Sequence, residues 1–195
     1  ETSEVLYHRC REIGINFFDC ADVYASGRSE EILGKLIASE RDQIVLTSKF
    51  YGATGKDVNA RGSSRLHIRQ AIEASLRRLG TDHLDVYFIH HFPADVPLEN
   101  VLRSLDDLVR EGKILYPAAS NFAAWQVAKA LGIAAWRGLT RFEVLQPMYN
   151  LVKRQAEVEI LPLAQAENLG VIPYSPMGGG LLTGAPTPNI DRLGR

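Results

Sequence analysis

The chain alternates short apolar segments with amphipathic stretches of helical spacing, and it does so along nearly its whole length of 195 residues. The apolar segments, each predicted to be a strand, cover residues 15–20, 44–48, 84–89, 114–119, 142–145 and 170–174. A helix between successive strands carries the chain back to the same edge of a sheet, so this alternation predicts a parallel sheet.

Residues typical of helix ends support the predicted alternation of strands and helices. Helices are predicted near 3–13, from 29 onward, at 64–79, 97–109, 125–131 and 157–168. Ser29 and Ser64 are expected to cap the helices that follow them, and Gly80 to end the third helix. Pro162 is a candidate interruption of the last helix. Residues 51–63 contain three glycines and no periodicity, so they are predicted to form a long functional or mobile loop.

Two architectures fit six strand-helix alternations: an open doubly wound sheet and a (β/α)₈ barrel. The doubly wound dinucleotide fold places a G-x-G-x-x-G turn after its first strand, and no such segment is present. The only glycine cluster, Gly178-Gly179-Gly180, lies late in the chain, where barrels commonly bind phosphate. We therefore predict one α/β domain over residues 1–195 with the barrel architecture, although six units are too few to close eight strands.

Composition narrows the possible partners. The formal net charge is −1, so there is no basic excess for nucleic acid, and no apolar run reaches the roughly 20 residues of a membrane span. The acidic start, Glu1 to Glu4, lacks the features of a secretory signal. Cys10 and Cys20 make a poor disulfide framework. A cytoplasmic protein without metal ligands is expected, and the sequence leaves its oligomeric state open.

Polar side chains follow the predicted strands. Because barrel chemistry sits at the carboxyl ends of the strands, these residues are the functional candidates. They are Asp19, Tyr24, Lys49, His90, His91, Ser120, Asn121, Gln146, Tyr174 and Ser175. Each alone has an ordinary structural explanation, such as a turn cap for Asp19, a solvated amine for Lys49 or a helix cap for Ser120. Their shared position on one rim favours a site.

These segments resemble a known family. Residues 18–24, with Asp19 and Tyr24, resemble the D-x-A-x-x-Y segment of the aldo-keto reductases, and residues 47–50, with Lys49, resemble their T/S-K segment. Residues 84–90 resemble the L-D-x-Y-x-I-H strand of that family. Its cofactor-side motifs are similar to residues 120–122, 146–151 and 174–176. Arg154 and residues 179–184 resemble the corresponding positions in the bacterial branch of the family, which includes the potassium-channel β subunits.

The resemblance implies reduction of an aldehyde or ketone to an alcohol with NADPH, or with NADH. Tyr24 would give a proton to the nascent alkoxide, and His90 would orient the carbonyl. A nearby Lys49 ammonium is expected to lower the pKa of the Tyr24 phenol, and Asp19 to keep Lys49 charged. The hydride chemistry belongs to the cofactor, and the partner is a small carbonyl substrate.

The resemblance also implies a cofactor site. Ser120, Asn121 and Gln146 would bind the nicotinamide carboxamide, and Tyr174 would stack beneath the ring. Ser175 and the backbone near Gly180 and Leu182 would approach the pyrophosphate. The family's usual first and last barrel units have no counterpart here, so the resemblance implies strands two to seven only. Pro117 stands in the fourth predicted strand, where it is expected to distort the ladder.

The sequence leaves two other functions open. A regulatory subunit would keep the fold and the nucleotide site as a redox sensor, and slow turnover of an aldehyde with NADPH would reveal it. A lyase would use Lys49 as a Schiff-base former, which borohydride trapping would reveal. The pairing of Lys49 with Asp19 expected here argues against the lyase, because a Schiff-base lysine must be neutral.

Overall fold

A computed structural model describes residues 2–94 and 96–184 of the chain. Its centre is a six-stranded parallel sheet in which the order in space, β1-β2-β3-β4-β5-β6, follows the order in the sequence. The strands are β1 (Phe17–Asp19), β2 (Val45–Phe50), β3 (Leu84–Ile89), β4 (Ile114–Ser120), β5 (Val144–Gln146) and β6 (Gly170–Val171). A doubly wound sheet would reverse its strand order near the middle, so that architecture is excluded.

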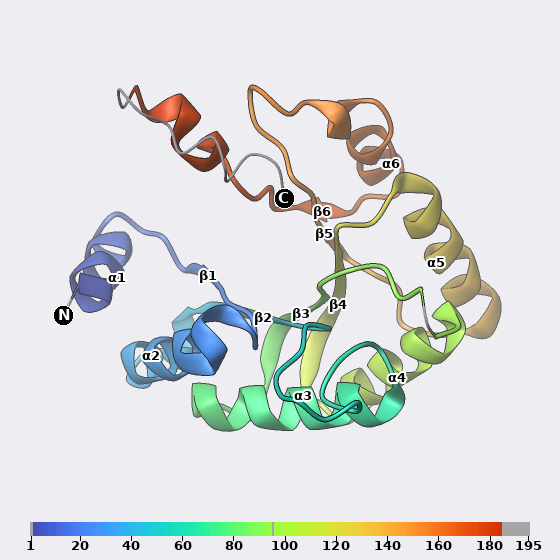
Figure 1. Ribbon diagram of the computed structural model, residues 1–195, viewed down its shortest axis with the longest axis horizontal. Helices are drawn as coiled ribbons and strands as arrows, with labels where there is room; N and C mark the ends of the chain where they lie inside the picture. Colours follow the sequence, from blue (N-terminus) through green and yellow to red (C-terminus); the bar gives the residue numbers. More distant parts are fainter. Residues whose placement is uncertain (1, 95, 185–195) are drawn as a thin grey trace.

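Helices surround the sheet on its outer side. They are α1 (Thr2–Glu12), α2 (Arg28–Ile37), α3 (Arg65–Leu79), α4 (Leu98–Arg110), α5 (Ala124–Arg137) and α6 (Ile160–Ala166). Short 3₁₀ helices are η1 (Tyr24–Gly27), η2 (Arg41–Gln43), η3 (Gln155–Glu157) and η4 (Gly178–Thr183). The arc of helices stays open, with α1 near one end and η4 near the other (Figure 1). The prediction of an incomplete (β/α)₈ barrel is confirmed.

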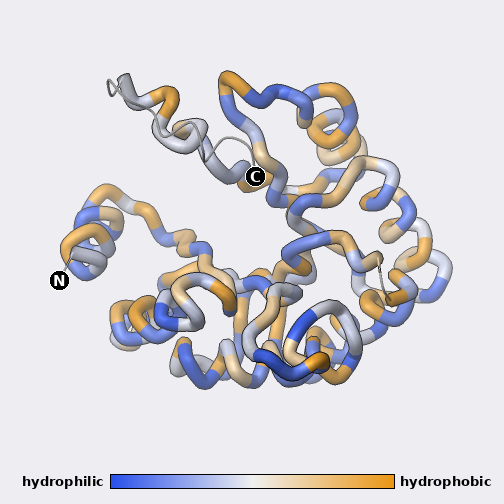
Figure 2. The backbone as a smooth tube through the Cα atoms, viewed as in Figure 1, coloured by the Kyte–Doolittle hydropathy of each residue, from blue (hydrophilic) through white to orange (hydrophobic). Residues whose placement is uncertain are grey.

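The two faces of the sheet contribute to different apolar clusters. Tyr87 and Ile89 of β3 belong to the large cluster shared with the helices, whereas Val86 and Phe88 belong to a small separate cluster with Ala118. This alternation follows from the two-residue period of a strand. The hydropathy colouring shows orange segments along the strands and blue ones scattered over the outer helices (Figure 2). The layer between sheet and helices is therefore the main core.

The two ends of α3 agree with the expected capping residues, whereas the start of α2 does not. The Ser64 side chain accepts a hydrogen bond from the His67 N–H at 3.1 Å, and Gly80 ends α3 in the left-handed conformation, both as expected. The expectation that Ser29 caps a helix was wrong. Helix α2 follows Gly27, whose φ of 89° turns the chain into the helix, and the Ser29 hydroxyl instead contacts the Cys20 thiol at 3.1 Å.

Helices α2 and α3 approach each other closely at Gly34. A Cβ added to this glycine would lie 2.5 Å from the backbone oxygen of Leu79. Real Cβ contacts do not come this close, so only glycine allows the two helix backbones to pack at this distance. The contact holds α3 against α2, the helix that follows the Tyr24 segment.

Other differences from the sequence-based expectations concern the ends of the sheet. Strands β1 and β6 have only 3 and 2 residues, shorter than predicted. Strand β4 runs through Pro117 without a break, and the Pro117 carbonyl accepts a hydrogen bond from Glu143 at 3.0 Å. Pro162 lies in the first turn of α6, where a missing N–H is tolerated. The final part of the Gly- and Pro-rich tail, 185–195, lies outside the described residues.

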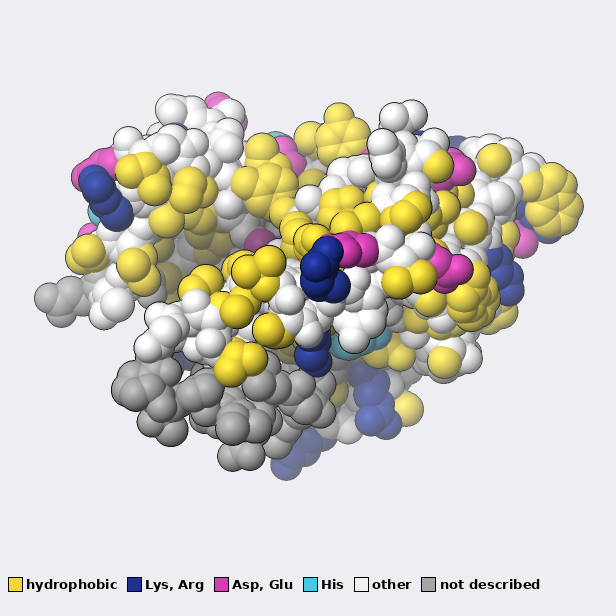
Figure 3. Space-filling model, turned by 90° about the horizontal axis from the view of Figure 1, so that it is seen from above, with side chains coloured by type: hydrophobic (Ala, Val, Ile, Leu, Met, Phe, Trp, Pro, Cys, Tyr) yellow, Lys and Arg dark blue, Asp and Glu magenta, His cyan; other side chains and the backbone are white. Residues whose placement is uncertain are grey.

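One face of the molecule carries exposed apolar side chains, as Figure 3 shows from above the view of Figure 1. Exposed large apolar residues of η4 and of the segments before α6 and η4 are Leu151, Val152, Val158, Met177 and Leu181. No helix among the described residues has the length and apolar character required to cross a membrane.

Candidate functional site

The candidate residues meet at the carboxyl ends of the strands. In the parallel ladder, Asp19 lies beside Thr47, Lys49 beside Phe88, and Ser120 beside Gln146. His90 follows directly after β3, and its N–H donates to the Phe50 carbonyl at 3.0 Å. The register therefore brings side chains from distant parts of the sequence onto one rim, as the barrel prediction required.

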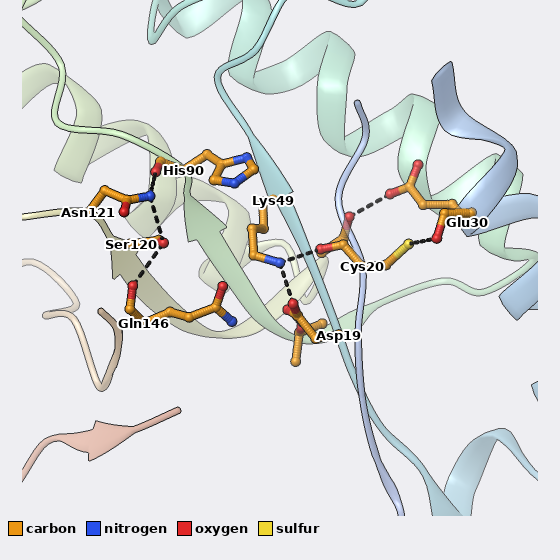
Figure 4. A network of polar contacts seen from close by, with 11 residues as sticks. Asp19, Cys20, Glu30, Lys49, His90, Ser120, Asn121 and Gln146 are labelled. Carbon is orange, nitrogen blue, oxygen red and sulfur yellow. Dashed lines mark hydrogen bonds and ion pairs between the residues drawn. The ribbon is translucent and has the colours of Figure 1, made fainter. Parts of the chain in front are cut away.

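Lys49 is fully buried and makes two contacts through its ammonium (Figure 4). The Nζ atom lies 2.5 Å from an oxygen of Asp19 and 2.8 Å from the Cys20 carbonyl oxygen. The other Asp19 oxygen accepts a hydrogen bond from the Thr47 hydroxyl at 2.6 Å. Asp19 is thus fixed between two residues of β2, with Thr47 as a partner that the sequence analysis did not identify.

Burial lowers the pKa of Lys49, whereas the charge and hydrogen bond of Asp19 raise it. An ammonium taken out of water is costly unless a counter-ion compensates it. The position of Asp19 therefore explains how a lysine with no exposed surface can carry a charge in this sheet.

Tyr24 lies close to this ion pair. The Lys49 Nζ atom is 5.0 Å from the centre of the Tyr24 ring, and the His90 ring centre is 6.0 Å from it in an edge-on arrangement. Tyr24 opens η1, and the two residues after it, Ala25 and Ser26, have positive φ angles. Within the described residues no hydrogen bond joins the Tyr24 hydroxyl to Lys49 or His90, and 40% of Tyr24 is exposed.

The electrostatics of Tyr24 differ from the expectation. Burial, followed by the negative charge of Asp19, raises the pKa of Tyr24 to about 12. The expected lowering by Lys49 is therefore absent, because burial and the Asp19 carboxylate both favour the protonated phenol. The phenol consequently stays protonated over the neutral pH range.

His90 is neutral at this position. Burial lowers its pKa to about 4, the positive charge of Lys49 contributes further, and Asp19 opposes the shift. The His90 ring stacks on the ring of His91 with a centroid distance of 5.1 Å and an interplanar angle of 17°. A neutral imidazole can donate one hydrogen bond and accept another, which suits it to orient an uncharged oxygen.

The residues expected on the cofactor side form a connected network (Figure 4). The Ser120 hydroxyl donates to the Gln146 backbone oxygen at 2.9 Å. The Asn121 amide donates to the His90 backbone oxygen at 2.9 Å and accepts from the Tyr174 hydroxyl at 2.8 Å. Asn121 has a φ of 60°, a conformation that asparagine tolerates better than most residues. The network joins the carboxyl ends of β4 and β5 with the segments that follow β3 and β6.

The predicted pyrophosphate segment lies at η4. The Ser175 carbonyl accepts a hydrogen bond from the Asn150 amide at 2.9 Å. A small cavity is lined by Ser175 together with Gly178 and Gly179, whereas the predicted Gly180 and Leu182 lie in the same 3₁₀ helix but outside that lining. The glycine cluster therefore lies near Ser175, and the assignment of this segment to the pyrophosphate stays a prediction.

A polar cluster on the helix side of the sheet escaped the sequence analysis. Glu30 is fully buried and accepts hydrogen bonds from the Ser48 hydroxyl at 2.5 Å and from Arg78 at 2.6 Å. Asp22 is also buried, and neither of its carboxylate oxygens has a hydrogen-bond partner. Burial, followed by the charge of Glu30, raises the pKa of Asp22 to about 7. No group of three or more potential metal-ligating side chains occurs in the described part of the chain.

Comparisons with known proteins agree with this geometry. The family described as "Aldo/keto reductase family" matches residues 1–193. A rice protein named as a probable voltage-gated potassium channel subunit beta is 37% identical over 93% of this chain and 56% of its own length. An uncharacterized oxidoreductase of Bacillus subtilis is 38% identical over 88% of this chain and 56% of its own length.

A third relative, norsolorinic acid reductase of Emericella nidulans, is 39% identical over 92% of this chain and 49% of its own length. The chain therefore spans about half the length of the curated relatives that it matches.

Proposed function

The chain belongs to the aldo/keto reductase family, and we propose that the protein reduces an aldehyde or ketone to an alcohol with a nicotinamide cofactor. The observation that carries this proposal is the convergence of Asp19, Lys49, Tyr24 and His90 at one rim, with the distances given above. A reductase name on a relative, norsolorinic acid reductase, supports the same reaction class.

In the proposed reaction, Tyr24 is the proton donor. Its phenol is protonated at neutral pH and 40% exposed, so it holds a proton that a bound substrate can reach. His90, neutral and adjacent, would donate a hydrogen bond to the carbonyl oxygen and orient it toward Tyr24. Lys49 would stabilise the phenolate left after proton transfer, and Asp19 would hold Lys49 in place.

The rim residues fit a nicotinamide cofactor, which supplies the hydride when bound. The Gln146 side chain and the Ser120-Asn121 pair offer amide and hydroxyl groups of the kind that bind a carboxamide. Tyr174 presents a half-buried ring beside Asn121 for stacking. Ser175 and the backbone near Gly180 and Leu182 are proposed to bind the pyrophosphate, and NADPH is the proposed cofactor, with NADH as the alternative.

A regulatory role is the second candidate, because a relative at 37% identity is named as a potassium channel β subunit. The two candidates differ in turnover. We expect the full-length protein to consume NADPH through many turnovers with a simple aldehyde. Tight NADPH binding by calorimetry, together with less than about one turnover per bound cofactor, would favour the regulatory role. The absence of both binding and turnover would contradict both proposals.

A further inference from the structure

Helix α5 presents both tryptophans of the chain to solvent. Trp125 is 60% exposed and Trp136 is 72% exposed, although tryptophan is highly buried on average in folded proteins. Eleven residues make about three helical turns, so the two side chains lie on the same side of α5, about 16 Å apart along its axis. Figure 1 places α5 between α4 and α6 on the outer side of the arc. This side of α5 therefore belongs to the outer surface and not to the proposed reaction site.

The exposed residues between the tryptophans are small or basic. Gly132 is one of them, and a Cβ added to it would meet no described atom within 4 Å. Exposed apolar surface with polar groups beside it is typical of sites that contact another protein or a membrane. We call the exposed residues on this side of the helix the tryptophan face: Trp125, Ala128, Lys129, Gly132, Ala135 and Trp136.

Both tryptophan rings are held by neighbouring side chains. The centre of the Trp125 ring lies 6.0 Å from the centre of the Phe92 ring in a tilted arrangement. The Arg137 guanidinium lies over the Trp136 ring, 3.7 Å from its centre. Each ring is therefore oriented before a partner binds, which reduces the entropy lost on binding.

The charge of this surface is positive. Helix α5 contains Lys129 and Arg137 but no aspartate or glutamate. Lys129 forms no hydrogen bond or ion pair with any residue that the structure describes. Arg137 contacts Glu99 of α4 at 3.1 Å, but Glu99 also pairs with Arg103 at 2.8 Å. Three basic groups thus accompany one carboxylate, in a chain whose formal net charge is −1, and this local excess attracts an anionic partner.

A second copy of the chain fits this surface poorly. A two-fold axis across the middle of α5 would bring Lys129 toward its symmetry mate, and like charges at a contact are unfavourable. An anionic lipid surface fits better. Tryptophan favours the headgroup level of a bilayer, where the ring meets apolar atoms and its N–H stays near water. Lysine is attracted to the negative headgroups.

We propose that the tryptophan face binds the anionic headgroup surface of a lipid bilayer. Trp125 and Trp136 enter the headgroup layer at the two ends of α5, and Lys129 contacts the negatively charged headgroups between them. The small residues of the tryptophan face allow the helix to approach the headgroups closely. Helix α5 lies along the membrane surface, so the contact needs no membrane-spanning segment.

The test measures co-sedimentation of the full-length protein with vesicles of two compositions, phosphatidylcholine alone and phosphatidylcholine with phosphatidylserine in equal parts. We expect binding only to the vesicles that contain phosphatidylserine. Binding should weaken as the salt concentration rises, because salt screens exposed charges. Tryptophan emission should shift to shorter wavelength on binding, since the indole rings leave water. Neither measurement depends on catalytic turnover.

Variants of exposed residues assign the binding to the tryptophan face. Lys129→Gln should weaken the association about 5-fold, because one basic group near an anionic membrane contributes about that factor. Trp136→Ala should weaken it as well and reduce the emission shift. Lys35→Gln in α2 and Leu66→Ala in α3 are the matched controls, since both residues are exposed on other helices. The controls should bind like the wild type, and thermal unfolding should be unchanged in all four variants.

Several outcomes would overturn the proposal. Equal binding to both kinds of vesicle would show that the headgroup charge is not recognised. An equal loss in Lys35→Gln and Lys129→Gln would show that the attraction does not belong to α5. An absence of binding to either vesicle would exclude a lipid surface. If sedimentation velocity then shows a dimer that Trp136→Ala dissociates, the tryptophan face is instead a contact between two copies.

Discussion

The buried ammonium of Lys49 lies 2.5 Å from the carboxylate of Asp19, which makes the charge of one dependent on the other. Asp19→Asn would leave Lys49 without its counter-ion. We expect a loss of about 2–4 kcal/mol in unfolding free energy near neutral pH, toward the lower end because Asp19 is partly exposed.

The loss should shrink at alkaline pH. Burial lowers the pKa of Lys49 below its unfolded value, so the native state of the variant binds fewer protons than the unfolded state until Lys49 is neutral in both. Stability of the variant should therefore rise with pH toward about pH 10. Urea titrations of both proteins at several pH values measure this, and a constant deficit at every pH would contradict the ion-pair explanation.

Tyr24→Phe should remove most of the proposed reductase activity and leave cofactor binding nearly intact, because it deletes only the proposed proton donor. We expect a fall in kcat of about 10²-fold or more. Lys49→Met should have a similar effect on kcat. Stopped-flow turnover and calorimetric NADPH titration provide the two readouts, and unchanged turnover in Tyr24→Phe would refute the proton-donor role.

His90 should not contribute an ionisation to the rate profile in the neutral range, since its pKa is about 4. The same shift affects stability. The unfolded state binds the proton more readily between about pH 4 and pH 6.5, so folding should weaken as the pH falls through that interval. NMR titration of the His90 ring, assigned with His90→Gln, measures the pKa. A midpoint near the ordinary value would contradict the buried, neutral assignment.

Asp22→Asn should stabilise the protein more at alkaline than at acidic pH. The folded pKa of Asp22, about 7, lies above its ordinary value of 3.8, so the native state binds more protons and wild-type stability falls as the pH rises between these values. The wild-type protein therefore loses on the order of 4 kcal/mol of unfolding free energy above about pH 7, where Asp22 must ionise in the folded state. This loss vanishes below about pH 4, where Asp22 is protonated in both states. Asn cannot ionise, so the difference between variant and wild type should follow this curve.

Denaturant unfolding at pH values on both sides of this interval tests the prediction. Asp42→Asn, an exposed aspartate in η2, serves as the matched control. A stability difference that is independent of pH in Asp22→Asn would show that the buried carboxyl is not protonated in the native state.

Gly34→Ala should destabilise the protein by about 2 kcal/mol or more, because its Cβ would meet the Leu79 backbone oxygen. Gly132→Ala in α5 is the control, since a Cβ there meets nothing within 4 Å. Replacing that helical glycine should stabilise the fold by about 0.5–1 kcal/mol. Thermal unfolding distinguishes the two, and equal effects would contradict the close helix approach.

The sequence predicted the candidate site best where a chemically functional side chain stands at the end of a predicted strand. Strand-end position identified Asp19, Lys49 and His90, because parallel strands bring their carboxyl ends to one rim. The direction of the Tyr24 pKa was missed, since it depends on Asp19 and on burial, which no spacing reveals. Tyr174 was identified as a rim aromatic, but its hydrogen bond to Asn121 depends on three-dimensional placement.

Long-range packing was beyond the sequence pattern. Ser29 has the residue type of a helix cap, yet the left-handed Gly27 determines where α2 begins. Glu30 sits in the first turn of α2, where an acidic residue is ordinary, and nothing in the sequence signals its pairing with Arg78 across the core. The close approach at Gly34 likewise depends on how two successive helices pack, which the pattern of either helix alone does not reveal.

The two-residue alternation of β2 assigns adjacent residues to separate tasks. Leu46 and Phe50 pack in the main core, while Thr47 and Lys49 hold Asp19. The two sets face opposite sides of the sheet, so a substitution in one set does not directly remove a contact made by the other. An insertion of one residue within 45–50 would move the residues on one side of the insertion to the opposite face of the sheet. We therefore expect insertions and deletions to be tolerated in the connecting loops but not inside this strand.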